Sequence, residues 1–244
     1  MRIICFTDHN DFDWPPDNTS FLLDCPSYIS RIADLREEYA GKIDIRCGIE
    51  CGLQTQIVKK NRELIGSAPF DFVIGSIHVV NDFDPFYPEY FAGRTDREAF
   101  MEYFQTVLEN IKAFDDFDVL GHMDYIVRYS PDKDKNFSLS AYSDIIDEIL
   151  KTLIEKGKGI EVNTGGLAAG LSDPNPRMEI VKRYRQLGGS IITVGSDAHT
   201  PGDVGRYFDA VPRFLSSCGF DHYTVFKNRK PEFISLQPIH SQRH

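Results

Sequence analysis

Six short apolar runs along the chain each stop at residues that can bind a metal ion or a polar ligand. The runs cover residues 2–6, 43–49, 72–77, 119–121, 159–162 and 190–194, and apolar runs of this kind are typical of buried β-strands. The residues that follow them are Thr7-Asp8-His9, Glu50, His78, His122, Asn163-Thr164 and Ser196-Asp197-Ala198-His199. Random placement would scatter such residues over helix surfaces, so the pattern predicts one polar edge of a sheet.

Helical segments alternate with these runs. Thr95 and Glu98 form the sequence pattern of a capping box, which predicts a helix from there to about residue 114. Other helices are expected near 27–41 with Ser27 as the cap, near 54–65, from Ser138 or Ser140 to 154, from Asn175-Pro176 to 188, and over much of 203–218. Alternating strands and helices predict a parallel sheet. Ligand-type residues after nearly every strand favour a barrel over a doubly wound sheet.

Composition excludes several classes of protein. The 244 residues suffice for one α/β barrel domain, and the net charge of −10 argues against a nucleic-acid partner. The five cysteines are odd in number and lack paired CxxC spacing, which indicates reduced thiols and a cytoplasmic protein. No apolar run reaches the ~20 residues that a membrane helix needs, and no signal-peptide pattern is present, so no membrane partner is expected.

The segment at residues 190–199 indicates a metal-binding site. Asp197 and His199 are two residues apart after a strand, where alternation would point both side chains the same way, and a carboxylate beside an imidazole suits a divalent metal. The alternative is an Asp that caps the next helix. The long aromatic loop at 81–93 is either a lid or packing, and the glycine-rich stretch 165–170 lacks the Gly-Lys-Ser/Thr of a phosphate-binding P-loop.

Several ordered motifs together resemble one family. They are Thr7-Asp8-His9, Gly48-Ile49-Glu50, Gly75-Ser76-Ile77-His78, Gly121-His122 with the segment to Tyr129, Glu161-Val162-Asn163-Thr164, Ser196-Asp197-Ala198-His199 and Arg229-Lys230-Pro231. This set resembles the PHP (polymerase and histidinol phosphatase) superfamily, and most closely its histidinol-phosphate phosphatases. The resemblance implies a distorted (β/α)7 barrel of TIM type. It also implies a trinuclear metal site that hydrolyses L-histidinol phosphate in histidine biosynthesis.

The resemblance also implies residue roles. Glu50 resembles the carboxylate that bridges two metals, and His78 and His122 resemble the other ligands of one of them. Asp197 resembles a ligand of the second metal, while His9 and His199 resemble ligands of the third. Arg128 resembles a contact to the substrate phosphate, although a surface ion pair is the alternative. On this mapping Glu50, Asp197 and Arg128 carry catalysis.

One departure from the family lies at the start of the chain. The family opens with a strand bearing His-x-His and a helix, whereas the match here begins at the second strand, so we expect a single PHP domain over 1–244 that lacks the first strand. Two of the three metals then lose ligands. The expectation is therefore one tightly bound metal, at Glu50, His78 and His122, and impaired activity.

Metals a few ångströms apart can activate water and neutralise the charge of a phosphoryl group. Mn, Fe or Zn would suit a mixed histidine and carboxylate site. A leaving alkoxide needs a proton, for which Asp11, Asp13, Glu161 and a metal-bound water are candidates. The alternatives to a histidinol-phosphate phosphatase are a PHP phosphoesterase for nucleotides or oligonucleotides, and a non-catalytic metal-binding remnant.

Overall fold

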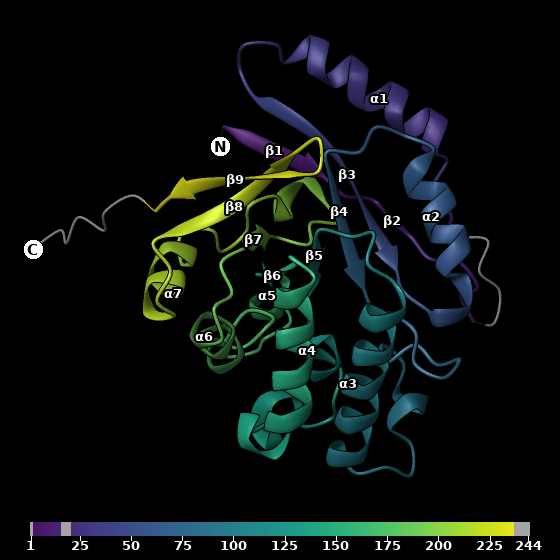
Figure 1. Ribbon diagram of the computed structural model, residues 1–244, viewed down its shortest axis with the longest axis vertical. Helices are drawn as coiled ribbons and strands as arrows, with labels where there is room; N and C mark the ends of the chain where they lie inside the picture. The colour runs from purple at the N-terminus through teal and green to yellow at the C-terminus, as the bar shows by residue number, and fades with distance from the viewer. Residues whose placement is uncertain (1, 16–20, 237–244) are drawn as a thin grey trace, which may run out of the picture.

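A curled parallel sheet forms the centre of the computed structural model, which describes residues 2–15 and 21–236 (Figure 1). Its strands follow the order β1-β3-β4-β5-β6-β7, and β2 also pairs with β3 beyond the end of β1. Every pairing within this sheet is parallel. The strands are β1 (Ile3–Phe6), β2 (His9–Asn10), β3 (Asp44–Gly52), β4 (Phe72–Ser76), β5 (Val119–Leu120), β6 (Gly159–Asn163) and β7 (Ile192–Gly195). The predicted class, an α/β fold of barrel type, is confirmed as a parallel half-barrel.

Helices connect the strands and cover the sheet. Figure 1 shows α1 and α2 at the side of β2 and β3, α3 and α4 next to each other, and α6 and α7 at the side of β7. The helices are α1 (Cys25–Glu38), α2 (Val58–Gly66), α3 (Asp96–Ala113), α4 (Ser143–Glu155), α5 (Gly165–Ala168), α6 (Met178–Gln186) and α7 (Val211–Ser217). The core between them and the sheet is rich in aromatic side chains, among which Phe100, Tyr103 and Phe104 of α3 are fully buried. In the described part of the chain, no helix has the length and hydropathy to cross a membrane.

The helix starts test the capping predictions. Thr95 and Glu98 make the reciprocal bonds of a capping box at the start of α3, as predicted. Ser27 does not cap α1; its backbone N–H and hydroxyl both donate to the Asp24 carboxylate, which is the cap. Ser138 precedes a short 3-10 helix and Ser140 lies within it, so α4 begins only at Ser143.

Asn175 is not a cap either, because α6 begins at Met178 and its first N–H groups need a different acceptor. The Asp173 carboxylate accepts from the Met178 N–H instead. Asn175 is fully buried and its side chain points to the interior. Local spacing could not distinguish the two roles, since Asn before Pro fits both.

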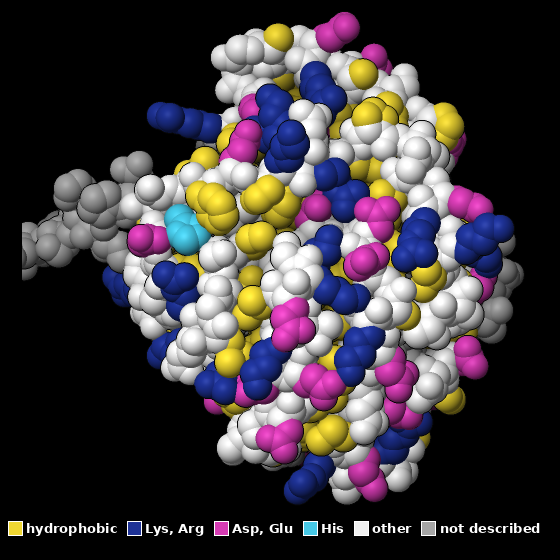
Figure 2. All heavy atoms as spheres, in the orientation of Figure 1, with side chains coloured by type: hydrophobic (Ala, Val, Ile, Leu, Met, Phe, Trp, Pro, Cys, Tyr) yellow, Lys and Arg dark blue, Asp and Glu magenta, His cyan; other side chains and the backbone are white. Residues whose placement is uncertain are grey.

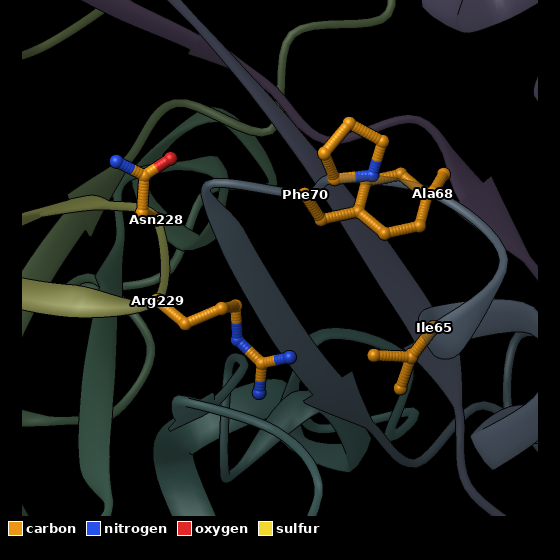
Figure 3. Close-up of a pocket in the computed structure, with 6 residues that line it drawn as sticks. Ile65, Ala68, Phe70, Asn228 and Arg229 are labelled. Carbon is orange, nitrogen blue, oxygen red and sulfur yellow. The ribbon is translucent and has the colours of Figure 1, made fainter.

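A two-stranded antiparallel hairpin, β8 (His222–Lys227) and β9 (Lys230–Ser235), ends the described chain beside the beginning of β1 and β3 (Figure 1). Arg229 binds the hairpin turn to the segment before β5. Its guanidinium donates to Asp118 at 2.7 Å and to Asp116 at 3.3 Å. Figure 3 shows Arg229 and Asn228 across from Ile65 and Phe70, around a cavity of 320 Å³. This cavity lies at the amino ends of the strands, the end opposite to the one where barrel proteins carry their active sites.

Candidate metal centre and active site

The carboxyl ends of neighbouring parallel strands bring Glu50, His78 and His122 together. Glu50 lies in β3, while His78 and His122 follow β4 and β5 by two residues each. The Glu50 Oε1 atom is 3.0 Å from His122 Nε2 and 3.3 Å from His78 Nε2, and the two imidazole nitrogens are 3.4 Å apart. These three side chains are the ones that sequence analysis assigned to a single metal.

Electrostatics couples these three groups. Burial alone would raise the pKa of Glu50, but hydrogen bonds and charge from His122 and His78 outweigh it and hold that pKa well below its usual value. Burial also opposes protonation of His78, whereas the Asp11 carboxylate, by charge and hydrogen bonding, raises its pKa well above the usual value. Burial lowers the pKa of His122. A neutral imidazole at His122 is a form that can bind a metal.

A second group, His9, Asp11 and His78, adjoins the first and shares His78 with it. His9 is placed there by β2, in which it pairs with Glu50 of β3. The Asp11 carboxylate bonds to both histidines, at 2.6 Å to His9 Nδ1 and 2.7 Å to His78 Nδ1. The described residues therefore hold two adjacent sets of metal-binding donors at the carboxyl edge of the sheet.

The donor set fits a divalent metal. In each group the ligand atoms lie within 4.8 Å of one another, close enough to bind one ion. Imidazole nitrogens together with carboxylate oxygens suit zinc, manganese or iron rather than calcium or magnesium.

Asp197 and His199 both follow the end of β7, so strand alternation does not govern their side chains, which corrects that part of the sequence argument. Strand β7 ends at Gly195, and Asp197 adopts a left-handed backbone conformation with φ +53°. The Asp197 side chain is 19% exposed and that of His199 is 71% exposed, and His199 Nδ1 lies 3.7 Å from Asp197 Oδ1. His199 still lies near the cluster, because its ring centroid is 6.2 Å from that of His9.

Arg128 is buried beside Asp197, so the alternative of a surface ion pair does not apply. Its guanidinium donates through Nε to Asn175 Oδ1 at 2.6 Å, and through its terminal nitrogens to Asp197 Oδ2 and Asn163 Oδ1, both at 2.8 Å. Burial opposes the negative charge of Asp197, but the Arg128 charge outweighs it and lowers the pKa of that carboxylate. An arginine has five N–H donors, so three bonds leave two N–H groups for a ligand.

A further layer of polar residues supports Arg128. Asn175 donates through Nδ2 to Asp124 Oδ1 at 2.5 Å, and the Arg177 backbone N–H donates to the other oxygen of Asp124. Asp124 and Asn175 are both fully buried. The sequence analysis treated Asn175 as a helix cap and connected none of Asp124, Asn163 and Asn175 with Arg128, because no periodicity links residues that meet from separate segments.

An open cavity of 240 Å³ lies over Arg128. Residues from the ends of β6 and β7 line it, including Asp197, His199, Gly165 and Arg206. Gly165 leaves room there, since a Cβ atom would come within 2.8 Å of Asn163 Oδ1. Two arginines, Arg128 and Arg206, therefore line one cavity together with Asp197 and His199.

The carboxylates considered as proton donors all have other partners. Asp11 accepts from the two histidines, and Asp13 pairs with Lys60 at 2.5 Å. Glu161 accepts from the His122 backbone N–H at 3.2 Å and from Asn163 at 3.1 Å. Burial and the nearby charge of Glu50 and Asp197 raise the pKa of Glu161 to about 8. Glu161 thus helps to fix the backbone position of His122.

The long loop after β4 both packs and faces solvent. Tyr90 and Phe91 are buried, whereas Phe83, Phe86 and Tyr87 are exposed. Phe86 contacts Tyr129 with ring centroids 5.2 Å apart, and Tyr129 contacts Tyr125, which packs on His122. An aromatic row therefore runs from the histidine cluster to the surface.

A parallel half-barrel with histidines and carboxylates gathered at its carboxyl edge defines the class of barrel-type metallohydrolases. Comparison with known families identifies the family within this class. The sequence matches the PHP domain family over residues 1–165, and the chain belongs to this family.

Curated relatives and a solved structure are consistent with this family. The histidinol-phosphatase of Lactococcus lactis subsp. lactis is 32% identical over 234 residues, which cover 94% of this chain and 85% of that protein. The probable histidinol-phosphatase of Clostridium acetobutylicum is 32% identical, over 95% of this chain and 84% of its own length. The crystal structure of the Lactococcus lactis histidinol phosphate phosphatase with zinc, L-histidinol and phosphate superposes with a TM-score of 0.84 at 30% identity, over 95% of this chain and 88% of that one.

Proposed function

We propose that this chain is a metal-dependent phosphomonoesterase that converts L-histidinol phosphate and water to L-histidinol and phosphate. The observation that carries the proposal is the Glu50, His78 and His122 cluster beside the buried guanidinium of Arg128. A cationic donor next to a divalent-metal site is what a phosphate dianion requires. The histidinol-phosphatase relatives support the same substrate.

The metal assignment follows the clusters and the family resemblance. Glu50 would bridge two ions, with His78 and His122 as further ligands of one, Asp197 as a ligand of the other, and His9 and His199 as ligands of a third. Bound divalent ions would supply an activated water and positive charge for the phosphoryl oxygens. Zinc, manganese and iron all suit these ligands. The donor atoms of Glu50, His78 and His122 lie within 3.4 Å of one another, so we expect this position to bind an ion tightly.

The chain's own residues would orient the substrate. Arg128 is held by three acceptors, so its two remaining N–H groups are fixed in direction before the phosphate binds. The cost of ordering this side chain is already met in the free protein, which favours binding of the phosphate. Burial of the guanidinium also strengthens its attraction to an anion, because little water screens it.

The setting of this activity is also a proposal. The described strands form one parallel sheet and one terminal hairpin. This arrangement supports a single domain over residues 1–244. The cysteines are all free thiols, which suits the reducing cytoplasm. On the face shown in Figure 2, acidic and basic side chains are interspersed, with no broad basic surface for nucleic acid.

Phosphate release from L-histidinol phosphate tests the proposal. The protein is stripped with chelator, reloaded with manganese or zinc, and assayed against a panel that includes nucleotides and oligonucleotide ends. We expect histidinol phosphate to have the highest kcat/KM, and Glu50→Gln or His122→Ala to lower it at least about 10³-fold. The matched control is His222→Ala, because His222 lies on the hairpin and bonds to Asp221.

Two results would contradict the proposal. Preference for a nucleotide would identify another PHP phosphoesterase, and no turnover of any substrate by the metal-loaded protein would identify a metal-binding protein without catalysis.

A further inference from the structure

The Asp11 side chain lies between two histidines that the proposed metal sites use separately. Its Oδ2 atom is 2.6 Å from His9 Nδ1 and its Oδ1 atom is 2.7 Å from His78 Nδ1. The side chain is 1% exposed, and among the described residues its ion-pair partners are these two imidazoles. A carboxylate buried this deeply normally needs a cation or several donors, so the two histidines are its compensation.

Hydrogen bonding at Nδ1 decides which nitrogen is free to bind a metal. An ionised carboxylate only accepts hydrogen bonds, so both imidazoles must carry a proton on Nδ1. In the neutral ring the other nitrogen, Nε2, then has the lone pair. His78 Nε2 indeed faces the cluster, 3.3 Å from Glu50 Oε1 and 3.4 Å from His122 Nε2.

We propose that Asp11 is a positioning residue that sets the ring orientation and the tautomer of both His9 and His78, and so links two neighbouring metal positions through one carboxylate. The inference rests on the proposed metal-dependent function only in assigning the two histidines to different ions. Carboxylates that bond to the outer nitrogen of a ligand histidine are common in metal sites, and their loss typically lowers metal affinity 10- to 100-fold.

The surrounding chain holds Asp11 in this place. Its backbone N–H donates to Phe21 O at 3.0 Å, and the preceding Asn10 side chain accepts from the Leu23 N–H at 2.9 Å. Gly52 gives the carboxylate its room, because a Cβ atom on Gly52 would lie 2.0 Å from Asp11 Oδ1. The segment after β2 is therefore anchored by hydrogen bonds to residues 21 and 23.

Direct ligation is the competing role. His9, Asp11 and His78 could themselves enclose one ion, which would bind His78 through Nδ1 and break the hydrogen bond to Asp11. Positioning requires the opposite, namely coordination through Nε2 with the bond to Asp11 intact. The two roles thus differ in which nitrogen of His78 bears the metal.

Nitrogen NMR of the histidines separates these roles. The protein is labelled with ¹⁵N-histidine and loaded with ¹¹³Cd, and long-range ¹H–¹⁵N spectra are recorded before and after loading. We expect Nδ1 of both His9 and His78 to carry a proton before loading, and cadmium coupling at Nε2 of His78 afterwards. Coupling at Nδ1 of His78 would overturn the proposal, as would an Nε2–H tautomer at both histidines before loading.

Variants give a second readout, the affinity for zinc measured by chelator competition. Asp11→Asn keeps one acceptor oxygen but presents an NH₂ group to the other histidine, so we expect 10- to 100-fold weaker zinc binding at one position and a changed tautomer in one ring. Asp11→Ala should weaken both positions. The matched control is Asp118→Asn, which alters a buried carboxylate at the opposite end of the sheet and should leave zinc affinity unchanged.

Circular dichroism and thermal unfolding confirm that each variant is folded. Zinc affinity and tautomers of Asp11→Asn equal to those of the wild type would overturn the inference. If the protein fails to hydrolyse histidinol phosphate but the NMR and affinity results hold, the proposed substrate is wrong and the role of Asp11 stands.

Discussion

The charged guanidinium of Arg128 is buried, and the acceptors around it hold it in one orientation. Three acceptors from separate segments hold the guanidinium, and the residue is only 8% exposed. Such a site distinguishes arginine from lysine, because a lysine ammonium is a point charge that cannot match three acceptors in one plane.

Replacing Arg128 with lysine tests this distinction. We expect Arg128→Lys to lower kcat/KM for histidinol phosphate about 10²- to 10³-fold, the equivalent of about 3 to 4 kcal/mol. Phosphate release at subsaturating substrate measures it. Arg183→Lys is the control, since Arg183 pairs with Asp147 on the surface of α6 and α4 and should change kcat/KM by less than about twofold. Equal effects of the two substitutions would exclude a special role for Arg128.

Asp124 should make the stability of the folded protein depend on pH. Burial raises its pKa from 3.8 to about 6, although hydrogen bonds from Asn175 and Arg177 oppose the shift. The folded state therefore binds the proton more tightly than the unfolded state. This contribution to stability is fully present below about pH 4 and is lost as the pH rises through about 6.

Urea unfolding of the wild type and of Asp124→Asn between pH 4 and 8 measures this effect. The stability of the wild type relative to the variant should fall by up to about 3 kcal/mol over this range, since one pKa unit corresponds to about 1.4 kcal/mol. A difference between the two proteins that is independent of pH would show that Asp124 titrates alike in the folded and unfolded states.

At the scale of elements, strand ends and helix starts have different roles. The strand ends supply the metal-binding groups, and Asp197, in a left-handed conformation after β7, is mostly buried while His199 is exposed. The helix starts contribute stability instead. Thr95 and Glu98 at the start of α3 illustrate this, because they lie on an exposed part of the chain.

Removing the Thr95 cap should weaken the fold without affecting the site. Thr95→Ala leaves the Glu98 backbone N–H without its side-chain acceptor, which typically costs about 1 kcal/mol. For a domain of this size that corresponds to a fall of about 2–4 °C in the melting temperature. Calorimetry would measure the fall, and zinc affinity should be unchanged. A parallel loss of zinc affinity would connect α3 to the metal centre.

At the scale of the whole molecule, the metal centre joins segments that are far apart in the chain. Glu50 lies in β3, His78 and His122 follow the next two strands, β4 and β5, and His9 lies before all of them. A ligand that binds only the folded state stabilises it in proportion to the logarithm of its concentration. Metal bound at these groups should therefore stabilise the entire domain.

Metal removal tests this coupling. At a free zinc concentration 100-fold above Kd, one site adds about 2.7 kcal/mol to the free energy of unfolding. The melting temperature should then fall by about 5–10 °C when chelator replaces zinc. Glu50→Gln should show a much smaller difference between the two conditions. A melting temperature that is insensitive to zinc in the wild type would mean that the clusters do not bind it.

The family resemblance grouped Glu50, His78 and His122 around one metal. The sequence by itself determined the α/β class, the parallel sheet and the meeting of strand-end polar residues at one edge. It could do so because parallel strands end at a common edge, so residues at matching strand ends become neighbours whatever the loops do. The same logic failed at Asp197 and His199, where the strand stops before the pair and strand alternation no longer applies.

Only the tertiary structure decided the surroundings of these groups. The Arg128 bonds to Asn163 and Asn175, the support of Asn175 by Asp124, and the bond of Asp11 to His78 join segments that are distant in sequence. Loop conformation depends on packing and has no repeat that spacing could reveal. A buried polar group takes whichever partner the fold brings within hydrogen-bonding distance, and that partner is known only once the chain has folded.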